Sequence, residues 1–161
     1  MSLKINATTS SGLSIVPDNS GQIELQSNGT TVATITPTGI TTQVGAPTFS
    51  VMLGADQVVS TGTTTKLAFS VKEWDTNNNF DATTNYRFTP TVAGYYFLNG
   101  ESQFGSSLST QYTTIYKNGS EFKRGGIPTS GYGMTTSALI YFNGSTDYVE
   151  FYVIQSSGSS Q

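Results

Sequence analysis

Apolar and polar residues alternate along short segments of this chain, which is the period of a β-strand with one buried face. Near the N-terminus the alternation covers residues 13–16, 22–26 and 31–36. Asn28-Gly29 separates the second of these segments from the third, and Asn-Gly tolerates the positive φ angles of a tight turn. We therefore predict a small β-hairpin with one apolar face close to the N-terminus.

The same alternation recurs at close intervals along the rest of the chain, and no stretch places good helix formers at helical spacing. Asn118-Gly119 and Asn143-Gly144 each lie between two alternating segments and predict two further hairpins. Strands are predicted at residues 48–53, 57–59, 66–71, 86–89, 95–98, 112–117, 120–123, 135–142 and 147–155. Short strands at this spacing predict an all-β sandwich or jelly roll.

The N-terminal hairpin has few apolar side chains, and an isolated hairpin is marginally stable in water. Its apolar residues are therefore expected to pack on the rest of the chain or on other subunits. Residues 41–47 are interpreted as a linker, with Pro47 fixing the start of the larger part. The predicted organisation is an N-terminal β attachment or trimerisation segment with its linker over residues 1–45, and a head domain over residues 46–161.

Composition excludes several kinds of chemistry. The chain has no cysteine and no histidine, so it lacks a thiol nucleophile, a disulfide frame and the usual general base. Its net charge is −3, and Lys123-Arg124 is its one adjacent basic pair, which argues against nucleic acid binding. No apolar stretch approaches the length of a membrane helix, and no apolar run follows Lys4. We expect neither membrane insertion nor a signal peptide.

Five spaced features stand between residues 69 and 98: an aromatic, an Asx residue, a second aromatic, a Phe-Thr pair and a Gly-x-Tyr. In this sequence they are Phe69, Asp75, Phe80, Phe88-Thr89 and Gly94-Tyr95-Tyr96. This spacing resembles the signature of the globular heads of complement C1q and their tumour-necrosis-factor-like relatives. The resemblance implies a C1q/TNF-like jelly-roll sandwich that assembles as a trimer.

Members of that family carry one more strand, beyond the position of residues 148–154. Here residues 155–161 are polar and close the sequence. We therefore expect an open sheet edge beside residues 147–154. Either the sequence is a piece of a longer protein, or another segment fills the position, with residues 13–16 and 31–36 as the candidates.

The loop after Trp74 is a weak candidate for calcium binding. Asp75, Asn77 and Asn79 place oxygen side chains at every second position, as a calcium loop does. Phe80 and Tyr86, however, stand where such a loop needs a glycine and a bidentate glutamate. Capping of turns by Asx side chains is the favoured interpretation, and no cofactor is expected.

Other side chains suggest carbohydrate chemistry. Trp74 has the ring to stack on a sugar, although packing is favoured for it. Glu73 with Asp75, or Asp147 with Glu150, has the spacing of a glycosidase pair. Such pairs are common on polar loops, and we predict that the protein is not an enzyme.

Aromatic residues are dense near the two strands predicted at residues 95–98 and 147–155. Alternation places Tyr95 and Phe97 on one sheet face, with Tyr96 and Leu98 on the other. A sheet face exposed to solvent does not usually carry so many aromatic residues. We therefore expect both faces to be covered, one by the core of the domain and the other by another subunit. The predicted trimer interface comprises Tyr95, Tyr96, Phe97, Tyr148, Phe151 and Tyr152.

These observations favour a virion structural protein of the kind found in bacteriophages. It would be a homotrimeric short tail fibre or capsid decoration (head fibre), made in the host cytoplasm. The N-terminal segment would attach it to other virion proteins, and the head would contact a host-surface glycan or protein. The alternative is a bacterial surface adhesin or lectin-like glycan-binding module.

Overall fold

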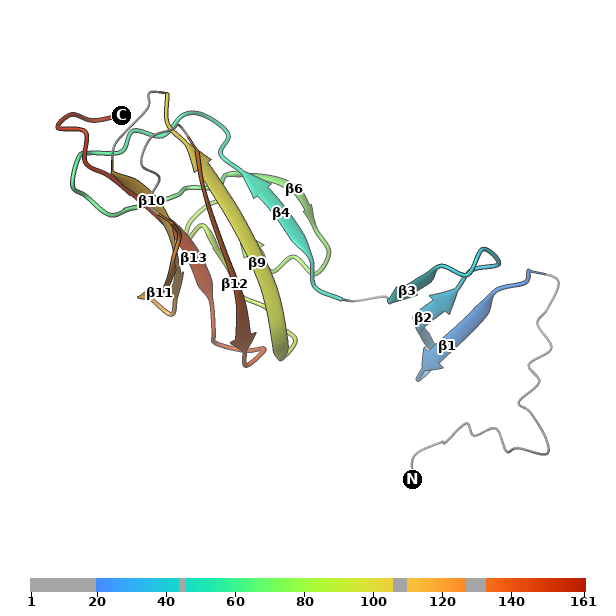
Figure 1. Cartoon of the computed structure of the whole chain (residues 1–161). Coiled ribbons are helices and arrows are strands. Elements are labelled where there is room, and N and C mark those ends of the chain that lie inside the picture. Colours follow the sequence, from blue (N-terminus) through green and yellow to red (C-terminus); the bar gives the residue numbers. More distant parts are fainter. Residues whose placement is uncertain (1–19, 44–45, 106–109, 127–132) are drawn as a thin grey trace. The chain divides into compact units, whose positions relative to one another are not determined.

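The computed structural model describes residues 20–43, 46–105, 110–126 and 133–161 (Figure 1). Every regular element in these ranges is a β-strand, and all strand pairs are antiparallel. No helix long and apolar enough to cross a membrane occurs in this part of the chain. The chain divides between Ala46 and Pro47 into two compact units.

The N-terminal unit contains a three-stranded antiparallel sheet. Strands β1 (Ile23–Ser27) and β2 (Thr30–Ile35) form the predicted hairpin, and β3 (Thr41–Gln43) pairs with the other edge of β2. The turn between β1 and β2 has positive φ angles at Asn28 (50°) and Gly29 (77°), as its sequence predicts. The interpretation of residues 41–47 as a linker is therefore wrong for residues 41–43, because these three residues form strand β3.

Few side chains are buried within this small sheet. Leu25, Val32, Ile35 and Ile40 are all exposed, and every buried hydrophobic residue of the described chain belongs to the second unit. Among its described residues, the N-terminal unit therefore has no buried hydrophobic side chain, which agrees with the prediction. Because β2 is paired on both edges, residues 31–36 are not free to fill a gap elsewhere. The other candidate filler, residues 13–16, lies outside the described residues.

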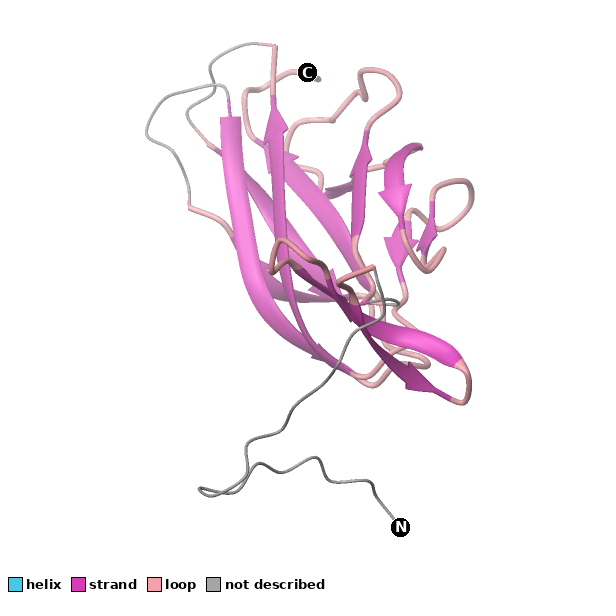
Figure 2. Ribbon diagram, turned by 90° about the vertical axis from the view of Figure 1, so that its right-hand side faces the viewer, coloured by secondary structure: helices cyan, strands magenta, loops and turns pink. Residues whose placement is uncertain are grey.

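The second unit contains one six-stranded sheet and two strand pairs (Figures 1 and 2). The large sheet has the order β11-β10-β13-β8-β7, and β5 also pairs with β13. One strand pair is β9–β12 and the other is β4–β6. The strands are β4 (Phe49–Met52), β5 (Thr65–Lys66), β6 (Val71–Asp75), β7 (Phe80–Asp81), β8 (Arg87–Phe88), β9 (Gly94–Gln103), β10 (Gln111–Lys117), β11 (Ser120–Arg124), β12 (Gly133–Phe142) and β13 (Val149–Gln155).

One of the two hairpins predicted in this unit is present. Strands β10 and β11 pair across Asn118-Gly119, whose φ angles are 52° and 78°. The hairpin predicted across Asn143-Gly144 is wrong, because β12 pairs with β9 while β13 pairs with β10. The Asn143 side chain accepts hydrogen bonds from three successive backbone N–H groups, of residues 145, 146 and 147. This Asx-capped turn carries the chain from one sheet to the other.

The core lies between the large sheet and the two strand pairs. Phe88 is its centre: it is fully buried, stacks on Phe49 at 4.2 Å between ring centroids, and meets Phe142 edge-on at 6.3 Å. Phe151 lies directly against the backbone of Gly100, where a Cβ atom would overlap its ring. Glycine in the middle of β9 is therefore required for the close approach of the sheets.

The open sheet edge is not where the sequence predicts it. Strand β13 pairs along its whole length with β10, and its other edge pairs with β5 and β8. The N–H of Leu67 also donates to the carbonyl of Phe151 at 2.9 Å. The prediction of a free edge beside residues 147–154 is therefore wrong. Strands β4 and β9 each pair on a single edge among the described residues, as do β6, β7, β11 and β12.

The loop after β7 is held by one carboxylate. Asp81 accepts hydrogen bonds from the backbone N–H groups of Thr83, Thr84 and Asn85, each at 3.0 Å, and from the Asn85 side chain at 2.8 Å. The N–H groups of Thr84 and Thr83, followed by the Asn85 amide, hold the pKa of Asp81 well below its usual value. Asp81 is thus an ionised cap.

This cap gives a pH prediction. Because the folded-state pKa is lowered, its stabilisation is present above the unfolded pKa of about 4 and is lost as the pH falls below it. Asp81→Asn should be less stable than wild type at pH 6, with the difference shrinking by pH 2.5. Urea unfolding at both pH values measures the difference in the free energy of unfolding between the variant and the wild type. Asp56→Asn is the control, because Asp56 is exposed. An equal difference at both pH values would contradict the capping role.

Candidate functional site: an exposed aromatic face

Strands β9 and β12 form a long pair whose two faces differ. In β9 the side chains of Tyr96 and Leu98 point into the core, and those of Tyr95 and Phe97 point outward. The alternation predicted for this segment is confirmed. It extends over all ten residues of β9, each of which has a partner in β12.

Four outward side chains make a continuous apolar patch. Phe97 lies opposite Leu139, and Tyr95 lies opposite Tyr141. The exposed fractions are 73% for Tyr95, 71% for Phe97, 63% for Leu139 and 49% for Tyr141. The two tyrosine rings meet edge-on with 5.3 Å between centroids. We call these four residues the aromatic face.

The aromatic face covers only one end of the strand pair. Farther along, Asn99 lies opposite Ser137 and Glu101 lies opposite Thr135, so the outward side chains become polar. Cross-strand pairing keeps the apolar groups together, since neighbours across an antiparallel pair lie about 5 Å apart. The result is a compact apolar patch with a polar border, an arrangement typical of a surface that binds another protein.

The other residues of the predicted interface lie elsewhere. Tyr96 packs between Phe88 and Phe142, donates to the Val92 carbonyl at 2.8 Å, and has a pKa raised by burial. Phe151 is in the core. The six predicted residues therefore do not form one surface.

The two remaining members lie on strand β13 of the large sheet or directly before it. Tyr152 lies on β13 and its ring is 4.2 Å from that of Tyr116 on β10. Tyr148 lies beneath the guanidinium group of Arg87, 4.3 Å from the ring centroid. Two of the six predicted residues, Tyr95 and Phe97, thus belong to the aromatic face.

Leu139 and Tyr141 were not recognised as site residues from the sequence. Their alternation with Ile140 and Phe142 shows that they share a strand face. It does not show that this face lies beside Tyr95 and Phe97, because the sequence favoured pairing of β12 with β13. Knowledge of the β9–β12 pairing would have identified them.

The proposed calcium loop is organised by Asx capping, as the sequence favours. The two oxygens of Asp75 accept the backbone N–H groups of Asn79 and Phe80, each at 2.9 Å. The Lys72 ammonium lies 3.4 Å from Asp75 and 2.8 Å from the side-chain oxygen of Asn78. Asn79 Nδ2 donates to the backbone carbonyl of Asn77. A cation at Asp75 would therefore compete with an ammonium group and two backbone donors.

The four candidate acidic residues have structural partners. Glu73 accepts from the Ser50 hydroxyl, and Asp75 caps its loop. Asp147 lies 3.0 Å from the Lys117 ammonium, and Glu150 lies 2.9 Å from that of Lys66. The Asn118 amide, followed by Lys117, lowers the pKa of Asp147, which is the wrong direction for a general acid. No group of three metal-ligating side chains occurs in the described residues.

The single tryptophan is the last sequence candidate. Trp74 lies on β6 and is 54% exposed, so the favoured packing role is wrong. Its alternative role, stacking on a sugar ring, stays a prediction.

The geometry thus defines an antiparallel all-β protein whose most prominent surface feature is the aromatic face. Compared with known proteins, the chain matches no family model and no curated protein.

Proposed function

We propose that this chain is the subunit of a homotrimeric virion structural protein, a short tail fibre or a capsid decoration, with a C1q/TNF-like jelly-roll head. The observation that carries the proposal is the aromatic face. The exposed fractions of its four side chains range from 49% to 73% in a single chain. An exposed apolar patch of this kind is the informative departure from ordinary burial.

Burial of the aromatic face between copies of the chain provides the assembly energy. Removing one such side chain from water contributes roughly 1.5–3 kcal/mol, and every subunit contributes the same four residues. Identical subunits most often close into a symmetric ring. A threefold ring is favoured here by the resemblance of residues 69–98 to the C1q-like signature.

A structural role agrees with the chemistry of the chain. The sequence has no histidine or cysteine, and the candidate carboxylates in the described part of the chain are engaged in loops and ion pairs. The small N-terminal sheet, whose apolar side chains are exposed, is suited to attachment to other virion proteins. The head would then be available to a host-surface receptor.

Native mass spectrometry tests the assembly. We expect a species of about 51 kDa, three times the 17.1 kDa of the chain, at micromolar concentration. A stable monomer would end the proposal.

Two further experiments test the role of the protein. Binding of antibodies against the head to purified virus particles tests whether the protein is part of the virion. Binding of the protein to a glycan array tests whether the head recognises host-surface glycans. Glycan binding by a protein absent from particles would instead support an adhesin.

A further inference from the structure

Strands β4 and β9 are two of the strands in the second unit that pair on one edge only. Strand β4 pairs only with β6, and β9 pairs only with β12, within the part of the chain that the structure describes. In an antiparallel pair, alternate residues direct their N–H and C=O groups away from the partner. About half of the ten residues of β9 therefore offer donors and acceptors on the side away from β12.

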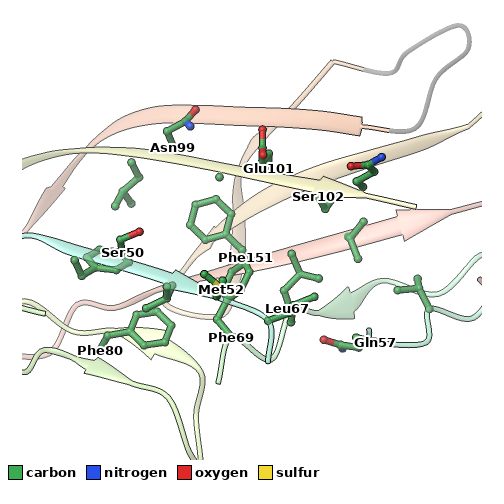
Figure 3. Close-up of a pocket in the computed structure, with 18 of the residues that line it drawn as sticks. Ser50, Met52, Gln57, Leu67, Phe69, Phe80, Asn99, Glu101, Ser102 and Phe151 are labelled. Atoms are coloured by element: carbon green, nitrogen blue, oxygen red, sulfur yellow. The ribbon is translucent and has the colours of Figure 1, made fainter. Parts of the chain in front are cut away.

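These two edges border the same cavity, which we call the strand slot. It has a volume of about 1150 Å³ and runs between β4 and β9 (Figure 3). Leu67, Phe69, Phe80, Phe151 and Val153 supply apolar lining from the core. The volume exceeds the roughly 300–1,000 Å³ of small-molecule sites, and the elongated lining matches a chain segment better than a compact ligand.

The lining is incompletely covered. Phe49, Val51, Leu53 and Phe69 pack against the core yet are only partly buried, and all four border the slot. An occupant would remove these side chains from water. It would also satisfy the backbone groups of both edges, each of which is a ready template for another strand.

The direction of the two strands specifies how a segment would fit. Strands β4 and β9 run the same way (Figures 1 and 3). A single strand between them, running the opposite way, would be antiparallel to both. It would join the two strand pairs into one sheet of order β6-β4-occupant-β9-β12.

Charge limits the sequence of the occupant. Asp56 and Glu101 are the two charged residues that line the slot, and no described lining residue is basic. An acidic segment is therefore disfavoured, and a lysine or arginine is favoured near Glu101.

The sequence of residues 13–16, the candidate filler within this chain, matches the slot poorly. Residues 13–16 are uncharged and alternate, but Pro17 follows them and lacks the N–H that a central strand needs. Four residues would also leave much of the β9 edge unpaired, since residues 96–105 of that strand and its continuation line the slot. The occupant should be longer.

We propose that the strand slot binds one extended peptide strand from outside residues 1–161, antiparallel to β4 and β9, with apolar side chains at alternate positions and no acidic residue. The inference rests on the two strand edges and the slot lining, and it is independent of the trimer and of the virion role.

The position of Gln161 offers a direct test. Its backbone exchanges two hydrogen bonds with Val59, at 2.7 and 3.0 Å, and it lines the slot, as do Phe104 and Gly105, which follow β9 in the chain. A strand antiparallel to β9 starts at this end. A segment fused after Gln161 through a short Gly-Ser linker can therefore enter the slot in the proposed direction.

The probe is an eight-residue segment of alternating Thr and Val with one Lys, added to the full chain as a blocked peptide or fused after Gln161. We expect the fusion to raise the melting temperature of the second unit by roughly 5 °C or more. Backbone amides along β4 and β9 should gain protection from hydrogen exchange. The free peptide should have the same effects in proportion to its concentration.

The matched control fusion carries proline in place of two Val residues, which removes N–H groups while keeping the segment uncharged apart from its Lys. It should leave melting and exchange unchanged. Equal effects of the two fusions, or no protection along β4 and β9, would overturn the proposal. Loss of stability on deleting residues 1–19 would also overturn it, by showing that the chain's own N-terminus already fills the slot.

Discussion

Replacing Phe97 by glutamate should convert the proposed trimer into a monomer. Phe97 is 71% exposed and lies opposite Leu139 on the aromatic face. The change removes an apolar contribution of roughly 1.5–3 kcal/mol in each subunit and brings three carboxylates into an apolar contact. We expect association at micromolar concentration to be lost, as measured by sedimentation velocity. The fold should persist, because this side chain points away from the core.

Phe122→Glu is the matched control. Phe122 is also an exposed phenylalanine on a strand, 48% exposed on β11, but it lies outside the aromatic face. This variant should remain a trimer. If the Phe97 variant stays trimeric as well, the subunits associate through some other surface. If both variants dissociate, added charge rather than the aromatic face explains the loss.

Replacing Phe88 by alanine should give the largest loss of stability. Its ring is 1% exposed and contacts three other rings, those of Phe49, Tyr96 and Phe142. A buried Phe→Ala change usually costs about 3–5 kcal/mol, against a total stability of about 5–15 kcal/mol for a domain. We expect the melting temperature to fall by roughly 10 °C or more.

Phe122→Ala is the corresponding control, and it should change the free energy of unfolding by no more than about 0.5 kcal/mol. Chemical denaturation followed by tyrosine and tryptophan fluorescence measures both variants. A Phe88 variant as stable as the control would mean that the two sheets do not pack through this ring.

The assembly and the strand slot are connected by position. Strand β9 carries two residues of the aromatic face on its outward side and contributes one edge to the slot. A strand bound in the slot would extend the same sheet, so its outward side chains would lie beside Phe97. Sedimentation of the strand fusion would therefore show whether filling the slot also strengthens association.

Local features of this protein were predictable from its sequence. The period-two alternation of residues 95–98 assigned Tyr95 and Phe97 to one face and Tyr96 and Leu98 to the other, as found. Asn28-Gly29 and Asn118-Gly119 identified two hairpins, because positive φ angles depend on the residues in the turn itself. The Asx caps at Asp75 have the same local origin.

Strand pairing was decided only by the tertiary structure. The pairing of β12 with β9, rather than with its sequence neighbour β13, placed Leu139 and Tyr141 beside Phe97 and Tyr95. Strand β13 is paired on both edges, whereas β4 and β9 each keep one open edge. A strand with alternating apolar side chains can pair with any other strand whose apolar side chains lie on the same face of the sheet. Alternation alone therefore does not select the partner strand. Packing of Phe151 against Gly100, and of Phe88 among three rings, makes that selection across segments far apart in the chain.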